Sequence, residues 1–515
     1  MSDSKDEITA VKPGAVHDEH VVIEQDSLTT WQCLKANPKI VMWTLWANIG
    51  PLMVGYENLA MSVCLAMPAF QMRFATPVNG TLIIPAYWQS LWSAMYNVTT
   101  MLGSMSAGFC QDRFGRRSVF LASILIAVAG ISLVFTSNTP PEFLGGKIVS
   151  GYAMGLILAG TQTWVSEVAP LPMRGIALST YAIMLNLGLL LAISVTFSRV
   201  SIMNDSAFRV VFAVAWCFPG LLALGLPFMP ESPYWLTSKN RHEEARRALE
   251  RLSPAGQEIE PQLVQIQHSI ETERRLAAEK TSYLELFRGT NLRRSRILLI
   301  CMYMPQVAGA VLSSNAPYFL SQTGMDNNLI VKILQVAVSL GVVSAVLNVV
   351  AMTKFSHRTL MFSGVGVCLA FYLAMGIAGT MARTSTTLTV IGVAVAFPSI
   401  SYGPTVGASM AVAGEVSSIK LRSKSLAVGQ AFSSIVSTVW TIVLPYMFNQ
   451  DEADMGGNIG WIFFGMSAVY LVILYFDVPN TRGRSYEELD LMFEKKLPAK
   501  RFSSYKFDDE GEIAG

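Results

Sequence analysis

The sequence predicts an all-α, polytopic membrane protein with twelve spanning helices in two groups of six. Of its 515 residues, 52% are hydrophobic and only 14% are charged, which lies outside the usual range of soluble globular proteins. The apolar residues also form runs long enough to cross a bilayer, since a spanning helix needs about 20 of them. The runs lie near residues 41–70, 88–109, 118–138, 143–166, 176–198, 209–229, 297–321, 329–352, 358–381, 386–413, 424–448 and 459–478.

A charged segment separates the two groups of runs. Residues 230–296 contain ESPYWLTSKNRHEEARRALERL and IETERRLAAEK, whose charges recur at helical spacing, so short amphipathic helices in water are expected there. The first thirty residues are polar and acidic and lack the features of a cleavable signal, so they are expected to stay in the cytosol. The expected organisation is a cytosolic tail (1–40), a first bundle (41–229), a cytosolic linker (230–296), a second bundle (297–478) and a second cytosolic tail (479–515).

Basic residues predict the orientation, because short cytoplasmic loops collect lysine and arginine. Such residues follow the second, fourth, sixth, eighth and tenth spans, which places both termini in the cytosol; outside the linker they are Arg113, Arg116, Arg117, Arg174, Lys354, Arg358, Lys420, Arg422 and Lys424. Glycosylation sequons at Asn79 and Asn204 fall in the opposite loops. A third, at Asn97, lies within a span and is expected to be silent. We expect a multi-pass protein of the plasma membrane.

Several function classes are disfavoured by the composition. The net charge of +2 is too small to indicate nucleic-acid binding, and the six cysteines are scattered without CxxC spacing, so neither a disulfide scaffold nor a zinc site is indicated. No nucleophile–base or metal-ligand cluster stands out, which argues against an enzyme. We expect no cofactor, a small-molecule substrate and the lipid bilayer as partners, and a monomer.

The two halves repeat one spacing of charges. Glu167 ends the fourth span and Arg174 follows seven residues later, just as Glu415 ends the tenth and Arg422 follows seven residues later. The loop after the second span, GFCQDRFGRR, has a weaker counterpart after the eighth, TKFSHR, in which Arg358 keeps one charge. Two six-helix halves with matching charge clusters indicate an alternating-access transporter, whose substrate site lies between the halves near the membrane midplane.

Four motifs in the same order resemble the sugar porter family of the major facilitator superfamily, in particular its fungal α-glucoside (maltose) permease branch. They are GFCQDRFGRR at 108–117, Glu167 with Arg174, PESPYWL at 230–236 and VPNTRGRSYEELDLMFEKKLPAKRF at 478–502. The resemblance covers about residues 40–502 and implies the major facilitator fold. In the last motif the family's Pro-Glu-Thr reads Pro479-Asn480-Thr481, so one expected inner charge is missing.

The cytoplasmic motifs predict a gate. Gly115 allows a tight turn between two spans, and the charges around it would hold the inner side shut until the halves rock. Membrane topology alone also explains a basic cluster, but the repeated acid–base spacing favours a gate. Its expected members are Asp112, Arg113, Arg116 and Arg117, paired with Glu167 and Arg174, and in the second half Glu415 and Arg422. Of these, Asp112, Arg113, Glu167 and Arg174 are the preferred ones.

Glu57, in the stretch GYENLAMSVCLAMPAF, lies within the first span, where a carboxylate needs a partner or a role for its proton. In the proton-coupled porters that the sequence resembles, the corresponding acid binds the coupling proton opposite an arginine of the fourth span; here that position holds Lys147. Burial favours a neutral carboxyl and a nearby cation favours a charged one, so movement of Lys147 relative to Glu57 would bind and release a proton. The alternatives are a static ion pair, or a Lys147 that reaches the outer surface, about six residues or ~9 Å past Pro141.

The family's substrate contacts are only partly present. Its glutamine in the fifth span is replaced by Ala182. Its Gln-Gln-x-x-Gly-x-Asn motif in the seventh span begins here with Pro305 and ends with Val311, so that Gln306 is the one polar residue of the motif that remains. Sugar hydroxyl groups need several partners, because a buried unpaired polar group costs ~1–3 kcal/mol. The candidates are Gln306, Asn186, Gln162, Asn315, Tyr318, Asn348 and Gln430, with Trp88 and Tyr402 as stacking surfaces. Each of them, taken singly, is more often a hydrogen bond between helices.

Three functions remain open at this point. Proton-coupled uptake of an α-glucoside-like sugar or another small hydroxylated solute follows from the resemblance. Transport of a non-sugar metabolite in either direction, for example from a fungal secondary-metabolite gene cluster, is favoured by the apolar residues Ala182, Pro305 and Val311. A non-transporting sugar sensor is the third, and the short tail after Val478 argues against it.

Overall fold

The computed structural model describes residues 30–78, 81–254, 259–278, 282–418, 421–482, 486–499 and 502. Eleven helical segments in this part of the chain are long and apolar enough to cross a membrane. A twelfth, α6 (Ala86–Phe114), is less apolar but has 29 residues and packs against α8 and α21 within the bundle. The fold is therefore the all-α, twelve-span architecture that the sequence predicts.

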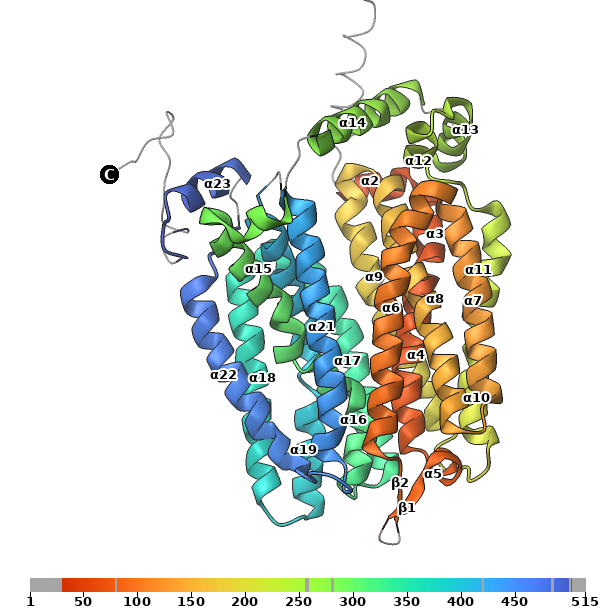
Figure 1. Cartoon of the computed structure of the whole chain (residues 1–515), viewed down its shortest axis with the longest axis vertical. Helices are drawn as coiled ribbons and strands as arrows, with labels where there is room; N and C mark the ends of the chain where they lie inside the picture. Colours follow the sequence, from red (N-terminus) through yellow and green to blue (C-terminus); the bar gives the residue numbers. More distant parts are fainter. Residues whose placement is uncertain are drawn as a thin grey trace, which may run out of the picture.

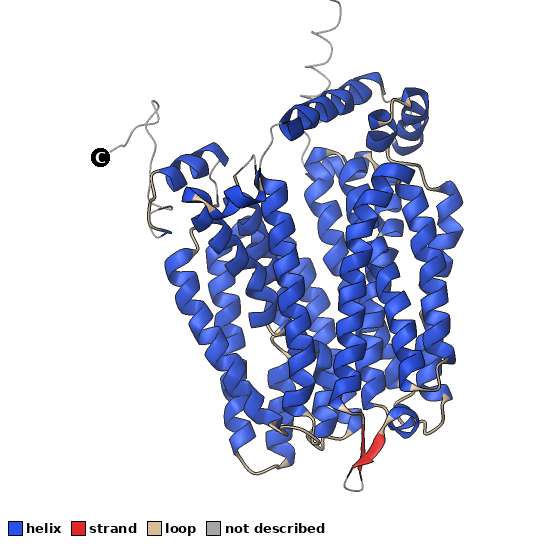
Figure 2. Ribbon diagram, in the orientation of Figure 1, coloured by secondary structure: helices blue, strands red, loops and turns tan. Residues whose placement is uncertain are grey.

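The first six spans and their flanking elements begin at the N-terminal end of the described chain. They comprise α2 (Thr30–Ala36), α3 (Pro38–Ala47) with α4 (Ile49–Ala66), α5 (Pro68–Phe74), α6, α7 (Arg116–Thr136), α8 (Pro140–Val168), α9 (Leu171–Phe197), and α10 (Ser206–Val214) with α11 (Cys217–Gly225) and η1 (Leu226–Phe228). The strands β1 (Thr76–Val78) and β2 (Thr81–Ile83) pair as an antiparallel hairpin between α5 and α6, and they are drawn in red in Figure 2.

The other six spans follow a group of short helices. The short helices are α12 (Pro233–Ser238), α13 (His242–Leu252), α14 (Glu260–Ala278) and η2 (Tyr283–Phe287). The spans are α15 (Gly289–Val307) with α16 (Ala310–Gln322), α17 (Asn327–Lys354), α18 (His357–Thr380), α19 (Ser385–Ala396) with α20 (Ser399–Val416), α21 (Arg422–Phe448), and η4 (Gly456–Asn458) with α22 (Ile459–Asp477); α23 (Tyr486–Glu494) comes last.

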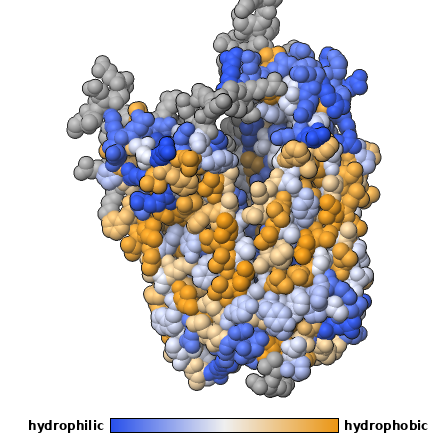
Figure 3. Space-filling model, in the orientation of Figure 1, coloured by the Kyte–Doolittle hydropathy of each residue, from blue (hydrophilic) through white to orange (hydrophobic). Residues whose placement is uncertain are grey.

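The helices stand in two groups, and the two ends of the bundle differ (Figure 1). Helices α12, α13, α14 and α23 lie at one end, which we call the linker end, and the β1–β2 hairpin lies at the other, the hairpin end. Figure 3 shows hydrophobic side chains gathered in a broad band between hydrophilic ends. This distribution suits a bundle that crosses a bilayer, because the hydrocarbon layer solvates apolar side chains and the ends face water.

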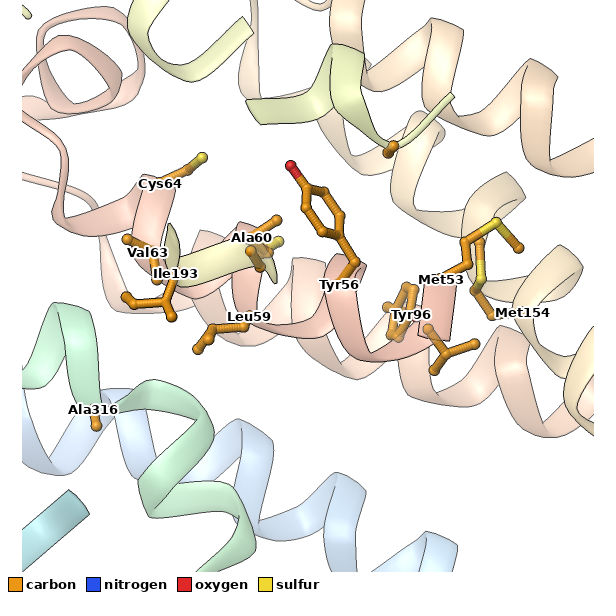
Figure 4. Close-up of a cluster of buried hydrophobic side chains, with 14 of the residues drawn as sticks. Met53, Tyr56, Leu59, Ala60, Val63, Cys64, Tyr96, Met154, Ile193 and Ala316 are labelled. Atoms are coloured by element: carbon orange, nitrogen blue, oxygen red, sulfur yellow. The ribbon is translucent and has the colours of Figure 1, made fainter. Parts of the chain in front are cut away.

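Helix α4 runs through the core of the first half. Almost all of its residues are buried, as expected for a helix that is apolar on every side. Figure 4 shows buried hydrophobic side chains of this helix, among them Met53, Tyr56 and Cys64. Ile193 of α9 and Ala316 of α16, in the second half, belong to the same cluster. A Cβ atom at Gly55 would lie 2.0 Å from the carbonyl oxygen of Leu185, and one at Gly188 would lie 2.0 Å from that of Leu52. Glycine at these positions lets α4 and α9 pack backbone to backbone.

The seventh span is broken into α15 and α16. Gly309, at the break, has a φ of +76°, which glycine adopts readily and other residues rarely do. Pro305, one turn earlier, has no N–H to donate within the helix. A Cβ atom at Gly309 would also lie 2.0 Å from the hydroxyl oxygen of Tyr372 on α18. The break is therefore specified both by the local backbone and by close packing.

Candidate functional site

Glu57 and Lys147 form a buried ion pair between α4 and α8. The Nζ atom of Lys147 lies 3.6 Å from Oε2 of Glu57, and the two side chains are 5% and 8% exposed, respectively. The same Nζ lies 4.6 Å from the ring centroid of Tyr96, a favourable position for a cation. Ser150 donates from Oγ to the Glu57 carboxylate, 2.7 Å from each oxygen. Lys147 does not reach the outer surface, so that alternative is wrong; a static ion pair and a proton-coupling pair both agree with the geometry.

The ion pair lies on the wall of a cavity of about 230 Å³ between the two halves. Helices α4, α6 and α8 line it from the first half, and α16 and α21 from the second. Its polar lining, besides the ion pair and Tyr96, consists of Asn58, Ser62, Ser93, Asn97, Ser314, Asn315, Ser437 and Thr441, and its apolar lining of Met61, Leu65, Ala310 and Val311. Many donors and acceptors around a small volume suit a solute that carries hydroxyl groups.

Of the predicted substrate contacts, Asn315 lines this cavity. Gln306 is buried in α15, and its Oε1 atom has no hydrogen-bond partner among the described residues. Tyr318 is fully buried, and its hydroxyl accepts a hydrogen bond from the backbone N–H of Ile84 at 3.3 Å, so it joins the halves and lies outside the cavity lining. The cavity thus brings together only part of the predicted set.

The remaining candidates are dispersed. Asn186 donates within α9 to the carbonyl oxygen of Ala182 at 2.8 Å, and Gln162 and Gln430 are exposed on α8 and α21. Asn348 has a buried Oδ1 atom without a partner in the described structure. Trp88 stacks against Trp92 with 5.9 Å between ring centroids. None of these residues lines the cavity beside Glu57.

Helix α6 supplies cavity residues that the sequence analysis did not select. Ser93, Tyr96 and Asn97 line the cavity, and Asn97, considered above only as a silent sequon, donates from Nδ2 to Oγ1 of Thr441 at 3.2 Å. A signal was available in the sequence: polar residues recur along α6 every three or four positions, at Ser90, Ser93, Asn97, Thr100 and Ser104. This spacing places them on one face of a helix.

Side-chain hydrogen bonds join the two halves at the hairpin end. Gln89 donates from Nε2 to the Ile84 carbonyl oxygen at 2.6 Å and to Oδ1 of Asn449 at 3.1 Å, while Asn449 donates from Nδ2 to the same carbonyl at 3.0 Å. Ser90 donates to the carbonyl oxygen of Ile442 at 2.8 Å. With the Tyr318–Ile84 bond, we call these the hairpin-end contacts. The Gln89–Ile84 bond lies within the first half, whereas the others join the two halves, as does the Asn97–Thr441 bond beside the cavity.

At the linker end, a network around Arg116 joins helices of the first half. Arg116 donates from Nε and Nη2 to the two carboxylate oxygens of Glu167, at 2.9 and 2.5 Å. Glu231, in the motif PESPYWL, accepts the backbone N–H groups of Arg116 and Arg117 at 2.9 and 3.2 Å, which satisfies the free donors at the start of α7. The ion pairs of Arg116 with Asp112 and Glu167 lie within the first half, so in this conformation they do not join it to the second half.

The predicted gate therefore needs correction. Arg113 is exposed beside the ring of Phe114, and no described carboxylate lies within ion-pair distance of it. Asp112 is 80% exposed and reaches Arg116 only at 3.8 Å, and Arg174 donates to the Ala169 carbonyl oxygen at 3.4 Å instead of pairing with Glu167.

The turn at Gly115 supplies the physical reason. Its φ of +91° separates the end of α6 from the start of α7, and the side chain that enters the protein after this turn is Arg116. A Cβ atom at residue 115 would lie 2.7 Å from Oε2 of Glu231. Gly115 is therefore required both for the turn and for the approach of Glu231, a site residue that the sequence analysis quoted in a motif but did not select.

The second half has a reduced version of this network. His357, the first residue of α18, has its Nδ1 atom 3.5 Å from Oε2 of Glu415, and Arg422 is close enough to attract Glu415 electrostatically. Arg358, which keeps one charge of this loop, donates to the carbonyl oxygen of Tyr475 at 2.7 Å. Asn480 replaces the expected glutamate, and its buried Oδ1 atom has no partner in the described part of the chain.

The two predicted glycosylation sites can be placed only in part. Asn204 is exposed in the loop between α9 and α10 at the hairpin end. Asn79 lies outside the described residues. Asn204 thus lies at the opposite end of the bundle from α12–α14, in agreement with the orientation predicted from the basic residues, which stays a prediction.

Twelve spans in two halves, with a polar cavity between them and a buried acid–base pair on the cavity wall, define a membrane protein of the major facilitator fold. The chain belongs to the "Sugar (and other) transporter" family, whose sequence profile matches residues 43–493. It is 28% identical over 498 residues to the MFS transporter fmqE of Aspergillus fumigatus, covering 94% of this chain and 92% of the relative. It is 27% identical to the general alpha-glucoside permease of Saccharomyces cerevisiae, covering 95% and 81%.

The fold is also similar to a solved structure, the inward-open xylose transporter XylE from E. coli. The TM-score is 0.68 at 22% identity, and the match covers 88% of this chain and 99% of that one. At this level of identity the similarity concerns the fold.

Proposed function

We propose that this protein is a proton-coupled secondary transporter that moves a sugar or another small hydroxylated solute by alternating access. One observation carries the proposal: the Glu57–Lys147 pair lies on the wall of a polar cavity between the two halves. A titratable acid at that place can respond both to the solute and to the relative position of the halves. The proton is then the coupling ion, and no cofactor or catalytic step is involved.

The contacts of Glu57 suggest how coupling would work. The charged carboxylate is stabilised by Lys147 and by the Ser150 hydroxyl. A proton on Glu57 would remove the attraction to Lys147, so that the cation turns toward the cavity or the ring of Tyr96. Tyr96 and Asn97 lie on α6, which contacts α21 of the other half. A change in the protonation state of Glu57 would therefore alter the contacts between the halves.

The hydrogen bonds between the halves support an inward-facing orientation. The hairpin-end contacts close one end of the cavity, and the linker end carries most of the basic loops that are expected on the cytosolic side. In this proposal the hairpin faces the exterior, both termini face the cytosol, and the protein resides in the plasma membrane.

Two substrate classes fit the cavity. Its hydroxyl- and amide-bearing lining favours a sugar, and the relatives include α-glucoside permeases. Its wall of Met61, Leu65, Ala310 and Val311 favours a partly apolar solute, and fmqE is a relative whose name specifies no sugar. We place a sugar first, because the polar lining residues outnumber the apolar ones and come from both halves.

Purified protein in sealed vesicles with an imposed proton gradient tests this proposal. We expect accumulation of an α-glucoside, a monosaccharide or another solute from a screened panel. Glu57→Gln should abolish accumulation against the gradient but keep exchange of the solute across the membrane, because glutamine keeps the size and hydrogen bonding but cannot titrate. Glu142→Gln, at an exposed acid in the first turn of α8, is the matched control and should accumulate normally. Accumulation by Glu57→Gln with wild-type proton dependence would refute the coupling role.

A further inference from the structure

A second, larger cavity lies on the outside of the second half at the linker end. It has a volume of about 950 Å³ and lies between α15, α21 and α22. Helix α15 packs against both α21 and α22 and forms its floor, and Figure 1 shows α15 between these two helices. Its walls are mainly apolar, with Leu299 and Ile300 of α15, Phe432 of α21, and Met466, Val469 and Ile473 of α22.

The position of this groove limits what can fill it. Its wall residues belong to membrane-spanning helices, and Val469 on its rim is 60% exposed, so the groove opens toward the hydrocarbon layer. An apolar space of this kind excludes water, and an empty one would forfeit the packing contacts of its lining. A lipid acyl chain is the occupant that the surroundings supply.

The mouth of the groove carries an excess of positive charge. Arg293 and Arg296, one turn apart at the start of α15, both line it. Arg296 is paired with Asp477, whereas no described carboxylate lies within ion-pair distance of Arg293. The Arg293 guanidinium donates from Nη1 to the carbonyl oxygen of Leu497 at 2.6 Å and lies 5.5 Å from the ring centroid of Phe493. It is thus held in place with further N–H groups available.

We propose that this groove binds one anionic glycerophospholipid. An acyl chain would lie along α15 and α22, and the phosphate would bind Arg293 and Arg296. A guanidinium binds phosphate oxygens in a bidentate manner, and the first-turn N–H groups of α15 add partial positive charge at the same place. The volume is near the upper end of the ~300–1,000 Å³ typical of small-molecule sites. The site is separate from the cavity between the halves and does not depend on the identity of the transported solute.

The test measures binding of two lipids with identical acyl chains, phosphatidylserine and phosphatidylcholine, to the purified protein by native mass spectrometry. Both lipids carry the phosphate, but the choline ammonium cancels its charge, whereas phosphatidylserine has a net negative charge. We therefore expect wild type to prefer phosphatidylserine by about five-fold, as one uncompensated arginine would give. Arg293→Gln should remove most of this preference. Equal binding of the two lipids by wild type, or an unchanged preference in Arg293→Gln, would overturn the proposal.

A second pair of variants tests the groove itself. Gly465 lines it, and a Cβ atom there would have no neighbour within 4 Å, so Gly465→Trp should fill the groove without disturbing α22 and should weaken binding of both lipids. Val472→Trp, on the same helix at a residue that is 58% exposed and outside the groove, is the control and should bind like wild type. Wild-type binding by Gly465→Trp would place the lipid elsewhere. A truncated variant that ends at Phe502 is the last comparison. If it bound more lipid than the full chain, the C-terminal tail and not a lipid would be the natural occupant of the groove.

Discussion

His357 occupies in the second half the place that Arg116 occupies in the first. Each is the first residue of the helix after a short linker-end loop, and each faces a glutamate near the end of a neighbouring span, Glu415 and Glu167 respectively. The two pairs differ in geometry: Arg116 binds Glu167 through two hydrogen bonds, of 2.9 and 2.5 Å, whereas Nδ1 of His357 lies 3.5 Å from Oε2 of Glu415. The contact in the second half is therefore the weaker of the two.

The contact between His357 and Glu415 gives the first prediction. His357→Ala removes the partner of Glu415 and should destabilise the protein by about 1 kcal/mol, the scale of a partly exposed ion pair. His357→Arg is the matched variant and should be at least as stable as wild type, because a guanidinium can bind the carboxylate through two hydrogen bonds. Thermal denaturation in detergent provides the measurement, and equal destabilisation by both variants would contradict the role of this contact.

The second prediction concerns Arg116 and Arg113, which are three residues apart. Arg116→Ala leaves Glu167 buried without its partner, and breaking a buried pair in this way costs ~3–5 kcal/mol. We expect a large loss of folded protein at the membrane, seen as a reduced monodisperse peak in size-exclusion chromatography. Arg113→Ala removes an exposed cation without an acidic partner and should stay within about 0.5 kcal/mol of wild type. The reverse order of effects would show that Arg113 is the paired residue.

The third prediction concerns the hairpin-end contacts. Asn449→Ala removes two of the hydrogen bonds that join the halves, which should shift the population toward the state open at the hairpin end by roughly ten-fold, given ~1–3 kcal/mol for buried hydrogen bonds. A cysteine at Ser314 in the cavity should then react faster with a membrane-impermeant thiol reagent added at the hairpin side. Gln450→Ala is the control, because Gln450 bonds to Gln322 of its own half. An unchanged labelling rate in Asn449→Ala would show that these contacts do not keep the hairpin end closed.

The fourth prediction compares two glycines of α9. Gly188→Ala places a methyl group 2.0 Å from the carbonyl oxygen of Leu52, so α4 and α9 must separate, at a cost of ~1–3 kcal/mol. Gly175→Ala meets no atom within 4 Å and should be neutral or stabilising by up to ~1 kcal/mol, because alanine favours the helix. Thermal denaturation of both variants in detergent provides the measurement. A Gly188→Ala variant as stable as Gly175→Ala would show that this interface can relax.

The sequence contained most of the information on the fold. Apolar runs bounded by charges specify the spans, and the repeat of Glu167 and Arg174 at Glu415 and Arg422 divides them into two halves. Helix α6 is the instructive exception, because its polar face lowers its hydropathy below that of the other spans. The sequence could place this helix in the membrane but could not show that its polar face meets α21.

The site was less predictable for a physical reason. Glu57 and Lys147 could be paired from the sequence, because an acid and a base within spans need partners. Which arginine pairs with Glu167 depends on the direction that the chain takes after the tight turn at Gly115. The sequence shows which arginines are nearby, but it does not show that direction. Contacts such as Gln89 with Asn449 join residues 360 positions apart, and only the packing of the two halves brings them together.

Helix α16 connects the cavity lining to the contacts at the hairpin end. Its thirteen residues follow the break at Gly309, and they carry both Asn315, in the cavity lining, and Tyr318, in the hairpin-end contacts. Because Asn315 and Tyr318 lie within one turn of this helix, a tilt about Gly309 that brings Asn315 closer to a solute would also strain the bond between Tyr318 and Ile84. Filling of the cavity and opening of the hairpin end would then be mechanically coupled within a single helical turn.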